Sequence, residues 1–69
     1  MKTESQILKE LKKAIDLSYD GLIAYKMGYK SSMTPNAWLN RGSIPTWNLR
    51  RLEAVLNEIF NDQKKEKIA

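Results

Sequence analysis

Five basic side chains lie in the middle of this chain without an acidic residue among them. They are Lys26, Lys30, Arg41, Arg50 and Arg51. The flanks are nearly balanced, with four Lys against four acids before Lys26 and three Lys against four acids after Arg51. Ammonium and guanidinium groups bind phosphate oxygens through charge-assisted hydrogen bonds. The sequence therefore predicts that residues 26–51 form the surface that meets a polyanion.

Chemistry other than binding has little support in the sequence. The chain has no His and no Cys, which removes the commonest general base, the commonest metal ligand and the strongest nucleophile. Asp16 and Asp20 are neighbours in sequence, but a predicted helix break separates them. Serines are present without an accompanying base. We therefore expect no enzyme, no metal site and no cofactor.

The length sets further bounds. A chain of 69 residues forms one domain near the lower size limit for a self-sufficient core. Without cysteine no disulfide can add stability, so helix packing must supply it, with help from a second subunit if one is present. No apolar run approaches the roughly 20 residues of a membrane span, and the N-terminus lacks a secretory pattern. A cytoplasmic protein is expected.

Apolar residues recur at helical spacing almost throughout. Thr3 and Gln6 form a capping-box pattern, which predicts a first helix that ends near Leu17. Ser18 or Asp20 is expected to cap a second helix that stops at Gly28. Ser31, Ser32 and Thr34 are candidate caps for a third helix, with Pro35 in its first turn, Trp38 and Leu39 on its buried side and Gly42 at its end.

The last helix is expected to open at Pro45 and Thr46. Its buried stripe is predicted to comprise Leu49, Leu52, Leu56 and Ile59, joined by Val55 and Phe60. Residues 61–69 are polar and predict a disordered tail after a domain of residues 1–60. The predicted fold is all-α, a compact bundle of about four helices. Two short helices joined by a glycine turn are typical of a helix-turn-helix, whose second helix can lie in the DNA major groove.

Several residues in this region carry a resemblance to a known family. The first short helix has Ala24 followed four residues later by Gly28, and the next has Trp38, then Arg41-Gly42 and Ile44-Pro45. This ordered set resembles the Cro/phage-repressor class of helix-turn-helix proteins in its small single-domain form. The resemblance extends from about Leu8 to Ile59. It implies a lambda repressor/Cro-like fold that binds a double-stranded DNA operator.

The chain departs from that family pattern in two places. The interval from Gly28 to Trp38 is one residue longer than in the most compact members, and Pro35 stands where the family usually has Val or Ile. The family's first motif helix commonly opens with a glutamine that anchors to a phosphate, whereas Asp20 and Gly21 occupy that area here. The phosphate anchor either moves to Ser18 or Tyr19 or is absent.

The resemblance implies that the helix around residues 32–41 reads the major groove. Asn36 is the best single candidate, because a carboxamide matches adenine N6 and N7. The residues predicted to read bases are Ser31, Ser32, Met33, Asn36 and Ala37. The residues predicted to contact phosphates are Lys26, Lys30, Thr34, Asn40, Arg41, Ser43 and Arg50. Trp38 is expected to be scaffold, and Trp47 either seals the core edge or lies in a subunit interface.

The expected function is sequence-specific regulation of transcription. The protein would act as a phage- or mobile-element-type repressor, cytoplasmic and nucleoid-associated, as a homodimer at least on DNA and without a small-molecule ligand. A second reading remains open, because fold does not determine function. On that reading the same scaffold is a protein-interaction module, antirepressor or antitoxin-like, with weak or no DNA binding.

Overall fold

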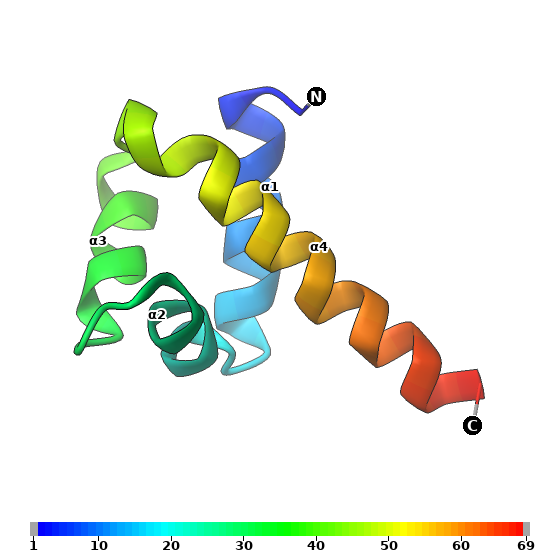
Figure 1. Cartoon of the computed structure of the whole chain (residues 1–69). Coiled ribbons are helices and arrows are strands. Elements are labelled where there is room, and N and C mark those ends of the chain that lie inside the picture. The colour runs from blue at the N-terminus through cyan, green and yellow to red at the C-terminus, as the bar shows by residue number, and fades with distance from the viewer. Residues whose placement is uncertain (1, 69) are drawn as a thin grey trace.

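The protein is composed of helices joined by short connections. The computed structural model describes the backbone of residues 2–68 and the side chains of residues 2–61. In chain order the helices are α1 (Glu4–Asp16), α2 (Asp20–Met27), α3 (Met33–Arg41) and α4 (Thr46–Ile68), as Figure 1 shows. No strand occurs among the described residues. The prediction of a compact all-α fold with about four helices is confirmed.

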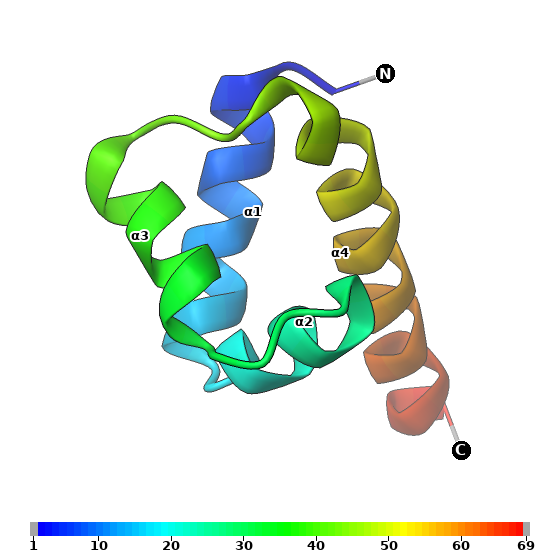
Figure 2. The ribbon, with the colours of Figure 1, turned by 60° about the vertical axis from the view of Figure 1, so that its left-hand side comes forward.

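The helices pack around a shared interior rather than in parallel layers. α1 contacts both α3 and α4, and α2 contacts both α3 and α4. Figure 2 shows α3 and α4 on either side of α1, with α2 crossing below them. The last turns of α4 extend past the other helices (Figure 1). Each short helix is therefore held by two others, and α3 is supported by α1 and α2.

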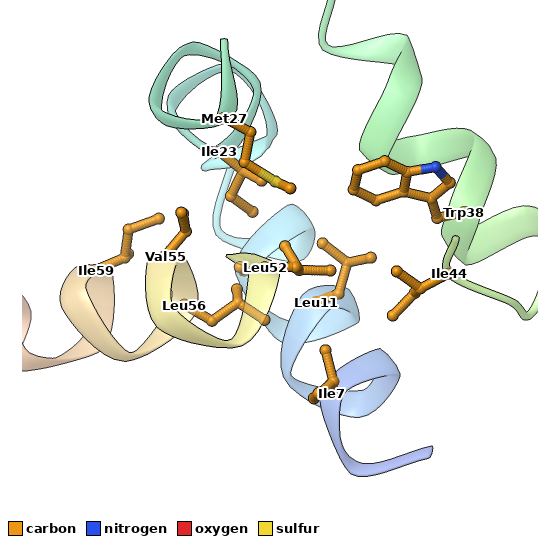
Figure 3. Close-up of a cluster of buried hydrophobic side chains, with 11 residues drawn as sticks. Ile7, Leu11, Ile23, Met27, Trp38, Ile44, Leu52, Val55, Leu56 and Ile59 are labelled. Atoms are coloured by element: carbon orange, nitrogen blue, oxygen red, sulfur yellow. The ribbon is translucent and has the colours of Figure 1, made fainter. Parts of the chain in front are cut away.

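The interior is filled by one apolar cluster to which all four helices contribute (Figure 3). Its buried members are Ile7, Leu11, Ala14, Ile23, Met27, Trp38, Ile44, Leu52, Val55, Leu56 and Ile59. The predicted stripe of α4 is largely confirmed, with Leu49 and Phe60 only partly buried against the cluster. Among the described side chains, every buried nitrogen or oxygen has a hydrogen-bond partner. Burial of apolar surface is thus the main stabilising contribution in a chain without disulfides.

Helix α1 begins with the predicted capping box. The Thr3 hydroxyl accepts from the Gln6 N–H at 3.2 Å, and Gln6 Oε1 accepts from the Thr3 N–H at 2.9 Å. The helix ends at Asp16 with Leu17 as its C-cap, close to the predicted end. Ser18 then adopts a left-handed backbone with φ 66°, and the Tyr19 N–H donates to the Ala14 carbonyl at 2.9 Å. This tight turn sends the chain directly into α2.

The predicted cap of α2 is wrong. Tyr19 is the N-cap residue and makes no capping hydrogen bond through its side chain. Ser18 is already used in the turn that closes α1, and Asp20 is the first residue inside α2. The end of one helix and the start of the next share these few residues, so local capping rules alone do not determine which residue caps α2.

Helix α3 begins at Met33, directly after Ser32, which is one of the three candidate caps. Ser31 Oγ accepts from the Met33 N–H at 3.1 Å, whereas Ser32 occupies the N-cap position without a side-chain bond. Pro35 is the third residue of the helix, where its missing N–H costs no hydrogen bond, and its ring is fully buried. Pro35 therefore lies in the first turn, as predicted, and fills part of the core-facing side of α3.

Two of the predicted helix ends depend on glycine. Gly28 ends α2 at φ 83° and Gly42 ends α3 at φ 73°, both in the left-handed region. The Tyr29 N–H then donates to the Ala24 carbonyl at 2.8 Å, which closes the last turn of α2. Glycine adopts this conformation without the steric cost that a Cβ imposes. Both predicted ends are confirmed.

The backbone of α4 continues into the segment predicted as a polar tail. Of residues 61–69, the helix includes the backbone as far as Ile68, and Ala69 lies outside the described residues. Gln, Lys and Glu have high helix propensity, and neither Gly nor Pro interrupts this segment. A polar sequence lacks the apolar residues needed to pack, but it does not stop a helix that is already formed.

Candidate nucleic-acid interface

Helix α3 presents two different sides. Pro35 and Trp38 are buried and Leu39 is partly buried, which turns one side into the core. The indole of Trp38 points toward the side chains of α1 and α2 (Figure 3), and Tyr29 packs edge-on against it with ring centroids 5.8 Å apart. Trp38 is only 3% exposed, so it serves as scaffold as predicted. Its burial determines which residues of α3 face solvent.

The solvent-facing side of α3 is a stripe formed by Met33, Ala37 and Asn40. All three are exposed, Met33 at 75%, and their spacing of four and three residues places them on one helix face. Ser31 is also exposed just before the helix, and Arg41 is exposed at its last position. Asn40, which the sequence assigned to phosphates, thus shares a face with two predicted base-reading residues.

The remaining two base-reading candidates lie at the edge of this stripe. Ser32 and Asn36 are half-buried. The Asn36 amide nitrogen donates to the Ser32 carbonyl at 2.9 Å and to Asp20 Oδ2 at 3.1 Å. Asp20 belongs to α2, so Asn36 lies where α2 and α3 meet. Both hydrogen bonds use the –NH₂ group, which leaves the Asn36 carbonyl oxygen Oδ1 as its remaining polar atom.

Asp20 is the residue that sequence reasoning missed. The sequence identifies Asp20 as a candidate helix cap and as an acid in an area where the resembled family places a glutamine, but not as a partner of Asn36. It is separated from Asn36 by 16 residues, so no helical or strand periodicity relates the two. Their contact depends on the packing of α2 against α3. No local signal could have predicted it.

Exposed polar groups lie at both ends of α3. Lys30 is exposed in the connection that precedes the helix, and Arg41 and Ser43 are exposed at and after its end. Thr34 is half-buried in the first turn. Cations and hydroxyls at these places suit phosphate oxygens, while the stripe between them suits base edges. Five of the seven predicted phosphate-contacting residues therefore lie on or next to α3, namely Lys30, Thr34, Asn40, Arg41 and Ser43.

The other two predicted phosphate-contacting residues have acidic partners elsewhere. Lys26 Nζ lies 2.8 Å from Glu58 Oε1, an ion pair that joins α2 to α4. Arg50 Nη1 lies 2.8 Å from Glu53 Oε1 and donates to the Lys2 carbonyl at 2.9 Å. Lys26 and Arg50 are thus directed toward α4 and the N-terminal segment, and the structure does not bring them together with α3.

Arg50 belongs to a polar cluster that ties the start of the chain to α4. The Lys2 N–H donates to Glu53 Oε2 at 3.0 Å, and Lys2 Nζ lies 2.7 Å from Glu10 Oε1. The hydrogen bond from the Lys2 backbone, followed by the one from Arg50, lowers the pKa of Glu53. The cluster holds α1 against α4 and gives Arg50 a structural role.

Two further hydrogen bonds hold the segments that border α3. The Glu4 carboxylate accepts from the Ile44 N–H at 2.9 Å, which attaches the connection after α3 to the start of α1. The Asn48 amide donates to the Tyr29 hydroxyl at 2.6 Å, which attaches the segment before α3 to the start of α4. Together with the burial of Trp38, these bonds hold α3 with the stripe of Met33, Ala37 and Asn40 facing outward.

Comparison with known proteins adds no relative to this description. The chain matches no protein-family model, no curated protein and no solved structure. Among the described residues there is no group of three or more His, Cys, Asp or Glu side chains that could hold a metal ion. In the same part of the chain, no helix has the length and apolar character that a membrane crossing requires.

Proposed function

We propose that this protein is a sequence-specific DNA-binding regulator of transcription that inserts α3 into the major groove. In this proposal α2 and α3 act as a helix-turn-helix of the Cro/phage-repressor type. The exposed stripe of α3 contacts base edges, and residues at both ends of the helix contact phosphates. Occupation of a promoter against polymerase would make it a repressor, of the kind that phages or mobile elements carry.

One observation carries this proposal. The stripe formed by Met33, Ala37 and Asn40 is exposed on a short helix, with the cations Lys30 and Arg41 at its two ends. No Asp or Glu occurs between Gly21 and Leu52. An exposed helix face without acids and bracketed by cations suits the negative potential of a DNA groove. The buried Trp38 supports the proposal because it fixes which side of the helix faces outward.

A dimer on DNA forms part of the proposal. One module of this size buries too little surface for tight specific binding, so two copies on half-sites about one helical turn apart are expected. A homodimer in the cytoplasm, associated with the nucleoid, is the corresponding cellular form.

Selection from a random duplex library at low salt tests the proposal directly. A two-fold symmetric motif among the retained sequences would support it and would report the half-site spacing. Affinity measured at several salt concentrations supplies the second readout, because released counterions make binding weaken steeply with salt. Failure to retain duplex DNA even at low salt would refute the proposal.

The alternative function is a protein-interaction module, antirepressor or antitoxin-like. The observation that favours it is the exposure of large apolar side chains away from α3, namely Trp47 at 81% on α4 and Tyr25 at 80% on α2. Exposed aromatic residues are typical of protein interfaces. A selection that recovers no DNA, combined with specific capture of one host protein that W47A abolishes, would favour this alternative.

A further inference from the structure

We propose that Asp20 positions Asn36 so that Asn36 reads the exocyclic amino group of a base, selecting adenine or cytosine at one position. Asn36 contacts the base, and Asp20 holds the Asn36 side chain in the orientation that makes this contact. This inference rests on the proposed DNA-binding function. It revises the sequence-based expectation, in which Asn36 pairs with adenine through both of its polar atoms.

The orientation of the Asn36 amide follows from its two neighbours. The Ser32 carbonyl at 2.9 Å and the Asp20 carboxylate at 3.1 Å are both hydrogen-bond acceptors. Only the –NH₂ group can face two acceptors, so the nitrogen and the oxygen cannot exchange places. Asn36 is also half-buried between α2 and α3, which limits rotation of the side chain. The carbonyl oxygen Oδ1 is the atom left for an external donor.

The positions of hydrogen-bond donors in the major groove then determine which bases Asn36 prefers. Adenine presents its N6 amino group and cytosine presents its N4 amino group, whereas guanine O6 and thymine O4 are acceptors. An amide that offers only an oxygen gains a hydrogen bond from adenine or cytosine and meets repulsion from guanine or thymine. Adenine gains nothing over cytosine, because its N7 needs a donor that Asn36 has already given to Asp20.

Asp20 also brings a negative charge to the edge of α3, a helix that itself contains no acidic residue. In the chain, the next acidic residue after Asp20 is Glu53. A carboxylate close to DNA repels phosphates and weakens binding to every sequence alike. The effect of this charge and the effect of the hydrogen bond are separable, because asparagine at position 20 keeps an acceptor oxygen and removes the charge.

The experiment compares the wild type with D20N, D20A and N36A by library selection, followed by titration of duplexes that differ at the Asn36 position. In D20N the preference for adenine and cytosine should persist while affinity for all sequences rises. In D20A the released N–H can donate to adenine N7, so adenine should be favoured over cytosine by roughly fivefold or more. N36A should lose the preference at this position and keep it at the others.

A measurement on the free protein, without DNA, shows whether each variant is folded. Side-chain amide signals in an NMR spectrum of the free protein should show Asn36 NH₂ protons shifted by their acceptors in the wild type and in D20N. D20A should move these signals toward the values of a free amide while the other amide signals stay in place. A purely structural role for Asp20 would not change base preference in a folded D20A variant.

The outcomes separate this inference from the proposed function. If the wild type binds DNA and folded D20A keeps its base preference, the role of Asp20 is refuted and the proposed function stands. A wild-type preference for adenine alone, or for guanine or thymine, also refutes it. If the wild type binds no DNA at all, the proposed function and this inference are both refuted.

Discussion

Asn48 and Tyr29 are joined by a hydrogen bond of 2.6 Å between the side-chain amide and the phenolic hydroxyl. Asn48 lies in the first turn of α4 and is 5% exposed, the one buried polar or charged residue among the described side chains. Tyr29 lies just after Gly28 and packs edge-on against Trp38. The bond therefore links the start of α4, through Tyr29, to the tryptophan that orients α3.

Removal of the Tyr29 hydroxyl should destabilise the fold. Y29F leaves the buried Asn48 amide without its acceptor, which costs about 1–3 kcal/mol. Y25F is the matched control, because Tyr25 is 80% exposed and should change stability by less than about 0.5 kcal/mol. Urea unfolding of both variants measures the difference. Equal midpoints for the two variants would show that the Asn48–Tyr29 bond contributes nothing.

Truncation of the two tryptophans to alanine should have very different effects on stability. Trp38 is 3% exposed and Trp47 is 81% exposed. W38A removes a large core side chain at a cost of about 3–5 kcal/mol, a large part of the stability of a small domain. W47A should stay within about 0.5 kcal/mol of the wild type. Thermal melts followed by far-UV circular dichroism test this, and a strongly destabilised W47A would mean that Trp47 packs in a subunit interface.

Gly28 and Gly21 give a second matched pair. Gly28 has φ 83° at the end of α2, and an added Cβ meets no atom but must adopt a left-handed backbone, which costs about 1–2 kcal/mol. Gly21 lies inside α2 with open space around it, so G21A should stabilise the protein by about 0.4–1 kcal/mol. Unfolding midpoints should move in opposite directions. A stabilising G28A would contradict the left-handed end of α2.

The lowered pKa of Glu53 predicts how its contribution varies with pH. Its ordinary value is 4.5, and the Lys2 N–H and then Arg50 lower the pKa in the folded protein. The ionised Glu53 therefore stabilises the fold above pH 4.5, and this contribution is lost as the pH falls through the lowered pKa. The stability difference between wild type and E53Q should be largest near neutral pH and shrink in acid.

The variant R50Q tests how much Arg50 contributes to the lowered pKa of Glu53. In R50Q the pH dependence of stability should weaken but should not disappear. The Lys2 N–H, which is the larger cause of the lowered pKa, is still present. Unfolding of the wild type, E53Q and R50Q at several pH values measures this. An E53Q difference that is constant with pH would show that the carboxylate has no preferred partner in the folded state.

Arg41 and Asn36 should differ in their effects on DNA binding. R41A removes an exposed cation at the end of α3, so affinity should fall alike for all sequences and the salt slope should decrease by about one. N36A should lose discrimination at one base position. K9A removes an exposed cation from α1 and serves as the control for charge. If R41A and K9A weaken binding equally, only net charge matters and α3 is not the contact surface.

Much of the fold could be predicted because it is encoded in short segments. The Thr3–Gln6 box, the helix ends at Gly28 and Gly42, and the buried position of Trp38 are each governed by residues within a few positions of one another. Helical periodicity and capping act at that range. The same patterns marked the outward side of α3, and they failed at Ser18 and Asp20, where two helices share residues.

The sequence by itself determined the four helices, the acid-free middle segment and the approximate extent of α3. Tertiary structure alone decided the partners of the polar side chains. Asp20 meets Asn36, Glu58 pairs with Lys26, and Asn48 bonds to Tyr29 only because distant helices pack against each other. Hydrogen bonds and ion pairs between residues far apart in the chain leave no trace in sequence spacing, so residues of α3 that look equivalent in the sequence differ in the folded protein.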